Sequence, residues 1–395
     1  MNKIIQGDCL DKLKELEDNS IDSIVTDPPY ELGFMGKSWD STGIANNVDM
    51  WKECLRVLKP GGHLLAFSGT RTYHRMAVAI EDAGFEIRDM IEWVYGSGFP
   101  KSHNIGKNIE KIKVGGIKNL KLIGTKKGIK VETGTQGFSY SKEYVAGKSM
   151  GGKQISGDIP VYEINNEWEG WGTALKPAHE PICMARKPLS EKSVAENCLK
   201  WGTGGINIDE SRVGTDENIT IHKGNKFGGI AGTTPETFKT DGQNLGRFPA
   251  NLIHDNSEEV RECFPETKQP SFRNGDRVSN NNGLVPWNKG RETGREVKGA
   301  GFTDTGNASR FFKSIIYQAK ASKSDRGQGN NHPTVKPIAL MEYLIKMVTK
   351  PGGIVLDPFA GSGSTLVAAK QNGFQYIGIE MTEEYIPIIN ARLGL

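Results

Sequence analysis

Four consecutive residues, Asp27, Pro28, Pro29 and Tyr30, combine the groups needed to hold an aromatic amine. The Asp27 carboxylate and the Pro28 carbonyl oxygen can both accept hydrogen bonds from one amino group. The prolines stiffen the turn because each fixes its own φ, so the acceptors are held in place before a substrate arrives. Tyr30 offers a ring on which a planar base can stack. As a bare tetrapeptide the segment is also consistent with an ordinary turn, so its meaning depends on what lies beside it.

A glycine-rich segment near the other end of the chain has the pattern of a nucleotide-type cofactor site. It runs Asp357-Pro358-Phe359-Ala360-Gly361-Ser362-Gly363-Ser364-Thr365, directly after a predicted strand and directly before a predicted helix. Its glycines allow a tight turn and close backbone approach, and the helix start offers unpaired N–H groups. Glu380 ends the next predicted strand, where a carboxylate binds ribose hydroxyls in nucleotide-binding folds. The third glycine of the dinucleotide fingerprint is replaced by Leu366, which argues against NAD.

Two shorter motifs are consistent with a ligand site but also with ordinary structure. Asp8 and Cys9 follow Gly7 just before a predicted helix, so Asp8 is either a ligand contact or a helix cap. His332-Pro333-Thr334-Val335-Lys336-Pro337 precedes another helix. A lysine near a helix start is electrostatically unfavourable, so Lys336 predicts a carboxylate partner or a ligand. The alternative is a helix start punctuated by prolines.

The elements that would position these motifs alternate between strand and helix at both ends of the chain. Short β-type runs end at prolines or glycines, and apolar residues at helical spacing fill the segments between them. This alternation predicts an α/β fold with a largely parallel sheet. The expected strands are 21–26, 63–67, 85–94, 180–186, 354–356 and 376–379. The expected helices are 11–16, 50–58, 72–83, 338–348, 364–371 and 383–393.

The middle of the chain differs in charge and pattern. Residues 101–330 hold 35 Lys and Arg against 26 Asp and Glu, a net charge of +9, whereas the remaining residues sum to −6. The sharpest part is Lys101–Lys130, with nine lysines against Glu110 alone. Glycine-rich polar stretches with little periodicity predict loops. Such asymmetry points to a polyanion, most simply nucleic acid, although a solvated lysine-rich loop is the alternative.

Composition sets further bounds. No apolar run approaches the roughly 18 residues of a membrane span, and the first residues lack a secretory pattern. The five cysteines are scattered and form no Cys-x-x-Cys pair, which predicts reduced thiols and no structural metal site. We therefore expect a cytoplasmic protein without a membrane partner.

With these motifs in hand, the sequence resembles the S-adenosylmethionine-dependent DNA amino-methyltransferases, in the subgroup whose catalytic motif precedes the cofactor motif. Asp27 to Tyr30 match the family's catalytic Asp-Pro-Pro-Tyr motif. Phe359, Gly361 and Gly363 match its Phe-x-Gly-x-Gly loop, and residues 332–337 and 7–9 match two further motifs. The run 171–186 is similar to the family's last sheet motif, and the resemblance covers about residues 1–100, 175–188 and 308–395.

The resemblance implies a Rossmann-like, seven-stranded mixed sheet with helices on both faces, interrupted by a long, basic, loop-rich insertion. It divides the chain into the first half of a catalytic domain (1–100), a basic insertion (101–175), a sheet strand (176–188), a target-recognition region (189–307) and a cofactor-binding second half (308–395).

The resemblance also implies roles for individual residues. Asp27 and the Pro28 carbonyl would bind the target amine, with Tyr30 stacked on the base. Glu380 would hold the ribose of S-adenosylmethionine, and Lys336 would lie near its methionine carboxylate. The expected cofactor-binding residues are Asp8, Cys9, Asp27, Lys336, Asp357, Phe359, Gly361, Ser362, Gly363, Thr365 and Glu380.

The sequence therefore predicts a DNA (adenine-N6) methyltransferase that acts on a base flipped out of double-stranded DNA. Asp at the first motif position is commoner among adenine-N6 enzymes, but this is a tendency. A cytosine-N4 enzyme, a non-catalytic DNA-binding module, and RNA or protein-amide methylation remain alternatives. A second copy of the chain, forming a homodimer, and a cognate restriction enzyme of a restriction-modification system are further possible partners. The expected DNA-binding residues are Lys101, Lys107, Lys111, Lys113, Arg273, Arg277, Arg291 and Arg295.

Overall fold

The structure is a computed structural model of the 395-residue chain. It describes residues 2–32, 40, 42–96, 98, 102–132, 138–141, 153–214, 246–268, 305–315 and 329–395. All structural statements below concern these residues.

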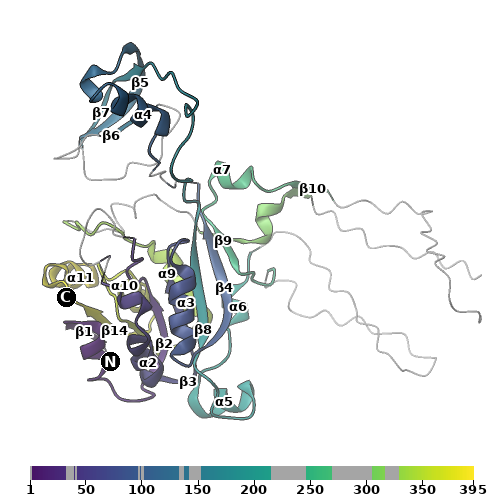
Figure 1. Ribbon diagram of the computed structural model, residues 1–395. Coiled ribbons are helices and arrows are strands. Elements are labelled where there is room, and N and C mark those ends of the chain that lie inside the picture. Colours follow the sequence, from purple (N-terminus) through teal and green to yellow (C-terminus); the bar gives the residue numbers. More distant parts are fainter. Residues whose placement is uncertain are drawn as a thin grey trace, which may run out of the picture.

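A twisted sheet of nine strands forms the centre of the molecule (Figure 1). Its order is β1-β14-β13-β2-β3-β8-β4-β9-β12. The strand bounds are β1 Asn2–Gln6, β2 Ile21–Thr26, β3 Leu58–Phe67, β4 Glu86–Val94, β8 His179–Arg186, β9 Leu252–His254, β12 Lys313–Ser314, β13 Ile354–Asp357 and β14 Gln375–Glu380.

All neighbouring strands in this sheet are parallel except those that pair with β8, which runs antiparallel to both β3 and β4. The predicted class, a mixed and mostly parallel sheet between helices, is confirmed. The expected count of seven strands is wrong, because β9 and β12 extend the edge beyond β4. These two strands have only three and two residues, too few to leave a periodic signal in the sequence.

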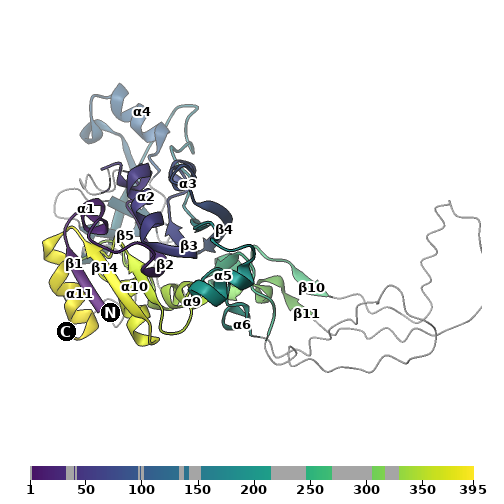
Figure 2. The same cartoon turned by 90° about the horizontal axis from the view of Figure 1, so that it is seen from below.

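Helices cover both faces of the sheet (Figure 2). One face packs against α1 (Cys9–Leu13), α2 (Val48–Val57) and α3 (Tyr73–Asp82). The other packs against α9 (Ile338–Val348), α10 (Ser364–Gln371) and α11 (Ile386–Leu393). Successive strand residues point to opposite faces, so alternate residues of the central strands enter the two cores. Two hydrophobic layers therefore fix the strands whose ends carry the candidate site.

The predicted elements agree with the structure to within a few residues. The bounds of α9 and α10 are those predicted. The strand β3 begins five residues earlier than expected. The chain becomes extended at Leu58, directly after α2, and stays extended through the segment 59–62, which was predicted only to end the helix. The predicted helix 383–393 begins with a 3₁₀ turn, Glu383–Tyr385, before α11.

The basic insertion is more regular than predicted. It contains α4 (Ile105–Lys113), a 3₁₀ turn (Ile117–Asn119), and a separate antiparallel sheet of β5 (Leu122–Glu132), β6 (Phe138–Ser141) and β7 (Lys153–Tyr162). This sheet stands apart from the central one in Figure 1. The loop prediction failed here because frequent lysine and glycine obscure the alternation that marks a half-buried strand.

In the region that the sequence predicted to recognise the target, and just after it, the described residues form mainly short elements. They are α5 (Val194–Trp201), α6 (Ile208–Ser211), α7 (Glu258–Arg261), the hairpin of β10 (Glu266–Lys268) with β11 (Thr305–Asn307), and a 3₁₀ turn (Ala308–Phe311). The loop predicted at 273–283 lies outside the described residues. Of the loop predicted at 299–306 only the last two residues are described, and this part of the prediction is wrong because both belong to β11. None of the helices in the described ranges is long and apolar enough to cross a membrane.

Candidate active site

The candidate site lies between β2 and β13, two neighbouring strands from which the chain continues to opposite sides of the sheet. From β2 the chain continues to β3 on one side, whereas from β13 it continues to β14 on the other, and β2 and β13 are neighbours. Ligands of open α/β sheets bind at such switch points, beyond the carboxyl ends of the strands. Asp27 directly follows β2, while Asp357 and Glu380 end β13 and β14. The two motifs from opposite ends of the sequence therefore meet at one edge.

Asp27 is held by an ion pair with a distant lysine. The Lys336 Nζ lies 2.6 Å from Asp27 Oδ2, and the two side chains are 10% and 20% exposed. The second carboxylate oxygen, Asp27 Oδ1, is buried and has no hydrogen-bond partner among the described residues. A buried acceptor without a partner is costly, so it favours the arrival of a donor. Beside it, Pro28 is buried and Pro29 is half-buried.

Tyr30 is fixed at both ends. Its hydroxyl donates to Glu180 Oε2 at 2.8 Å and accepts from Lys336 Nζ at 3.1 Å. Its carbonyl oxygen accepts from the Thr72 hydroxyl at 2.7 Å. The Lys336 ammonium also lies 5.2 Å from the Tyr30 ring centroid, within the range of a cation–π contact. The ring is therefore positioned by the fold and not by the substrate alone.

The electrostatics of this cluster favour a charged Lys336 and a neutral Tyr30. Burial disfavours the ammonium, but the carboxylates of Asp27 and Glu180 outweigh it and raise the pKa of Lys336 above its usual value. Burial, followed by the same two carboxylates, raises the pKa of the Tyr30 phenol well above its usual range. At neutral pH Lys336 therefore carries a full charge, and Tyr30 is a hydrogen-bond donor.

The glycine turn after β13 forms a backbone cradle. Gly361 and Gly363 have φ of 53° and 81°, in the region that favours glycine. Glu380 Oε2 accepts from the Gly361 N–H at 2.7 Å, and Glu380 Oε1 accepts from the Thr382 N–H at 2.8 Å. Glu380 is 8% exposed, and burial raises the pKa of its carboxyl. The predicted acid is thus tied directly to the predicted turn.

The remaining residues of the turn mainly contact the protein. Asp357 Oδ1 accepts from the Thr26 hydroxyl at 2.6 Å and from the Phe359 N–H at 3.1 Å, and burial raises the pKa of Asp357 to about 6. Thr365 is 1% exposed, and its side chain hydrogen-bonds Asp357. Ser362 contacts Arg392 of α11 through its carbonyl and hydroxyl oxygens at 2.6 and 3.0 Å. Asp357 therefore connects the turn to β2 one residue before Asp27.

Asp8 and Cys9 lie beside Glu380. The strand β1 pairs with β14 so that Gln6 faces Glu380, and the Gly7 N–H donates to the Glu380 carbonyl at 3.0 Å. Asp8 caps α1 by accepting from the Leu10 N–H at 2.9 Å, so the helix-cap interpretation is confirmed. Cys9 is 6% exposed, and burial, then the Asp8 charge, raises its pKa to about 12. Its thiol is therefore not poised as a nucleophile.

The segment from His332 to Lys336 joins the two motifs. A Cβ added to Gly361 would lie 3.0 Å from His332 Nε2, so the imidazole closes one side of the turn. Four residues later Lys336 reaches Asp27. The carboxylate partner that the sequence predicted for Lys336 is thus found in Asp27, with Glu180 at 3.3 Å as a second one.

Of the predicted DNA-binding residues, Lys107, Lys111 and Lys113 lie on α4 of the insertion, outside the cluster around Asp27. The Lys107 ammonium lies 4.5 Å from the Tyr162 ring centroid, and Lys113 pairs with Glu110 at 3.1 Å. The other predicted residues, Lys101, Arg273, Arg277, Arg291 and Arg295, lie outside the described residues.

Sequence reasoning missed two residues of the cluster. Glu180 accepts from both Tyr30 and Tyr95, whose hydroxyl lies 3.3 Å from Glu180 Oε1. Glu180 stands at the start of β8 and Tyr95 just after the end of β4. The sequence signal that could have identified Glu180 is the run 171–186, which is similar to the family's last sheet motif. This run indicates the site only when β8 is known to be antiparallel, because the first residues of β8 then lie at the carboxyl edge of the parallel strands.

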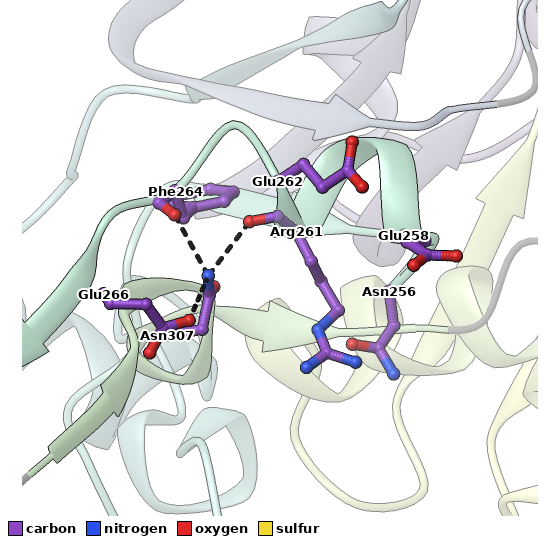
Figure 3. A pocket seen from close by; sticks show the side chains of 7 residues that line it. All are labelled: Asn256, Glu258, Arg261, Glu262, Phe264, Glu266 and Asn307. Carbon is purple, nitrogen blue, oxygen red and sulfur yellow. Dashed lines mark hydrogen bonds between the residues drawn. The ribbon is translucent and has the colours of Figure 1, made fainter.

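A hollow of about 670 Å³ lies elsewhere, beside α7 and the β10–β11 hairpin (Figure 3). Polar and charged side chains dominate its lining, and the Arg261 side chain extends alongside Asn256 in the figure. None of the predicted catalytic or cofactor residues lines it.

Comparison with known proteins agrees with this geometry. The model of the N6/N4 DNA methylase family matches residues 21–391. The type II methyltransferase M.HindIII of Haemophilus influenzae is 23% identical over 435 residues, covering 99% of this chain and 95% of that protein. The type II methyltransferase M2.DpnII of Streptococcus pneumoniae is 41% identical over 87 residues, covering 22% of this chain and 32% of that protein.

Solved structures give weaker likenesses. The M1.HpyAVI–SAM complex covers 100% of both chains at 18% identity with a TM-score of 0.40. The PvuII DNA methyltransferase, described as cytosine-N4-specific, covers 99% of this chain and 86% of its own at 15% identity with a TM-score of 0.46. Because the family model spans nearly the whole sequence, including Asp27, the glycine turn and Glu380, the chain belongs to the family of N6/N4 DNA methylases.

Proposed function

We propose that this DNA methylase transfers a methyl group from S-adenosylmethionine to N6 of an adenine flipped out of double-stranded DNA. One observation carries the proposal: Asp27 and the glycine turn follow neighbouring strands, β2 and β13. Asp27 is held in position, and one of its buried oxygens has no hydrogen-bond partner among the described residues. Membership of the DNA methylase family supports the substrate class. Asp at position 27 favours adenine, as it does more often than not in that family.

The residues around the turn fit a nucleoside cofactor. Gly361 carries no side chain where a Cβ would lie 3.0 Å from His332 Nε2, so the turn can pass close to the imidazole. The Glu380 carboxylate keeps free lone pairs for ribose hydroxyls because each oxygen can accept two hydrogen bonds. Asp8 and Cys9 lie close to Glu380, in reach of the adenine end. When bound, the cofactor would supply an electrophilic methyl group on a sulfonium.

The remaining proposed contacts support this cradle. Phe359, Ser362, Gly363 and Thr365 shape the turn, and Asp357 anchors it to β2. Lys336 links the catalytic motif to the glycine turn in space. It contacts Asp27, and His332, four residues earlier, lies against Gly361.

Asp27 and the Pro28 carbonyl oxygen would hold the two hydrogens of the exocyclic amine. The amine lone pair is delocalised into the ring, so holding both hydrogens would localise it and aim it at the methyl group. Such alignment is worth several kcal/mol, within the roughly 7–11 kcal/mol available to well-oriented reactions. The negative Asp27 also stabilises the positive charge that develops on nitrogen. The methylated amine is then acidic enough to lose its proton without a strong base.

Tyr30 would stack on the flipped base. Stacking on an aromatic ring returns roughly 1–3 kcal/mol per base. Extrusion from the duplex costs a few kcal/mol, so contacts to the DNA backbone must supply the remainder. The lysines of α4 support such contacts, and we propose residues 101–175 and 189–307 as the regions that face DNA.

The names of two relatives, both type II methyltransferases, support a restriction-modification setting with a cognate restriction enzyme. We also propose a homodimer, which sedimentation or light scattering of the full chain would test. Neither partner is needed for the chemistry at Asp27.

The test incubates the full chain with labelled S-adenosylmethionine and double-stranded DNA, followed by nucleoside analysis. N6-methyladenine that disappears in Asp27→Ala supports the proposal. N4-methylcytosine without N6-methyladenine would establish the alternative base. Full turnover by Asp27→Ala would remove the mechanism, and DNA binding without any methylation would favour a non-catalytic module.

A further inference from the structure

We propose that Glu180 is a positioning residue of the methyl-transfer site, which holds Tyr30 and prevents Lys336 from covering the amine-binding oxygen of Asp27. The inference rests on the proposed function and assigns a role to a residue outside both sequence motifs. It follows from three contacts of a single carboxylate at the start of β8.

Both oxygens of Glu180 are engaged by the site. Oε2 accepts from the Tyr30 hydroxyl at 2.8 Å and lies 3.3 Å from Lys336 Nζ, while Oε1 accepts from the Tyr95 hydroxyl at 3.3 Å. The side chain is 20% exposed. A largely buried carboxylate is stable only with such partners, so its position is determined by the site it touches.

Lys336 is shared between two carboxylates. The ammonium donates to Asp27 Oδ2 at 2.6 Å and to the Tyr30 hydroxyl at 3.1 Å, and it forms an ion pair with Glu180 Oε2 at 3.3 Å. This sharing leaves Asp27 Oδ1 without a partner among the described residues. Without the charge of Glu180, the ammonium would be free to pivot toward both oxygens of Asp27.

The charge balance points the same way. Asp27, Glu180 and Lys336 together carry a net charge of −1, which complements positive charge that develops on the substrate nitrogen. With Glu180 neutral, Asp27 and Lys336 would form a neutral pair. Glu180 therefore affects the reaction through Lys336 and Tyr30 and not by touching the base.

The decisive variant is Glu180→Gln, which keeps the size and an acceptor oxygen but removes the charge. Its matched control is Glu86→Gln, because Glu86 forms an ion pair with Arg186 at 2.6 Å on the same pair of strands, at the opposite end of the sheet. Both variants are assayed as full chains for kcat, for KM with a duplex carrying the target site, and for cofactor affinity.

We expect kcat of Glu180→Gln to fall by about 10²-fold, the scale of a misaligned reacting group. Cofactor affinity and the melting temperature should stay close to those of Glu86→Gln. In a duplex with 2-aminopurine at the target base, the fluorescence of the bound complex should change, because the Tyr30 ring is no longer held. A kcat within threefold of Glu86→Gln would overturn the proposal.

Glu180→Asp keeps the charge but withdraws it by one methylene, and it replaces Glu180→Gln if that variant melts below the assay temperature. Its kcat should then lie below that of wild type, with cofactor affinity unchanged, and a wild-type kcat would overturn the proposal. If the wild-type chain itself methylates no DNA, the proposed function fails. If wild type is active and the Glu180 variant is equally active, only the role of Glu180 fails.

Discussion

Lys336→Met tests the electrostatic argument most directly. The substitution keeps an unbranched side chain of similar length but removes the ammonium that lies 2.6 Å from Asp27 and 3.3 Å from Glu180. Two largely buried carboxylates then face each other without the cation between them. We expect a loss of both stability and methyl transfer.

The magnitude follows from burial. The Lys336 side chain is 10% exposed, and removal of one partner of a buried ion pair costs about 3–5 kcal/mol. Unfolding of a large domain shifts its melting temperature by roughly 2–4 °C per kcal/mol, so we expect a decrease of about 6–20 °C near neutral pH. Because Asp27 loses the ammonium that positions it, kcat should fall by about 10²-fold or more.

The pH dependence has a definite sign. In the wild type the pKa of Lys336 is raised above its usual 10.5, so the stabilisation by its charge is fully present below that pH and is lost only above it. The wild-type ion pair therefore does not titrate through Lys336 between pH 5 and 9. The stability deficit of Lys336→Met should therefore be nearly the same at pH 5, 6.5 and 8, because the charge that the substitution removes is complete throughout this range.

The assay is thermal unfolding at pH 5, 6.5 and 8, with steady-state methylation on the same samples. Lys346→Met is the control, because Lys346 forms a half-exposed ion pair with Glu342 at 2.7 Å on α9. Such surface pairs contribute about 0–1 kcal/mol. A melting temperature of Lys336→Met equal to that of Lys346→Met at pH 8, with wild-type kcat, would refute the reasoning.

Three further outcomes are expected. Gly363→Ala should weaken cofactor binding about tenfold in calorimetry, because φ of 81° costs a residue with a Cβ roughly 1–2 kcal/mol; unchanged affinity would contradict the role of the turn. Burial, then the Arg186 charge, lowers the pKa of His63 from 6.5 to about 4, so its neutral form stabilises the fold above pH 6.5 and this stabilisation is lost on acidification. In His63→Leu, the free energy of unfolding measured with urea should therefore fall less steeply between pH 6.5 and 4, by up to about 1.4 kcal/mol per pH unit. A slope equal to that of wild type would contradict this role of His63. Replacing Lys107, Lys111 and Lys113 with Gln should reduce the slope of the logarithm of the DNA-binding constant against the logarithm of salt concentration by up to about 3. An unchanged slope would show that these lysines do not contact DNA phosphates.

Local signals in the sequence were sufficient for much of the architecture. The apolar spacing of 338–348 and 364–371 gave the bounds of α9 and α10, because a helix face of this length repeats often enough to be recognised. The strand ends at Asp27 and Asp357 were marked by prolines, which interrupt the hydrogen-bond ladder. The regular part of the insertion and the edge strands β9 and β12 carried no comparable signal.

The sequence by itself determined which groups are available for the chemistry, since Asp27, Pro28, Tyr30, the glycine turn and Glu380 stand in short motifs whose residue types specify their possible contacts. Only the tertiary structure decided how they are combined. Lys336 reaches Asp27 across 309 residues, and Glu180 reaches Tyr30 across 150. Such contacts depend on strand order and on the antiparallel direction of β8, and local spacing in a sequence contains neither.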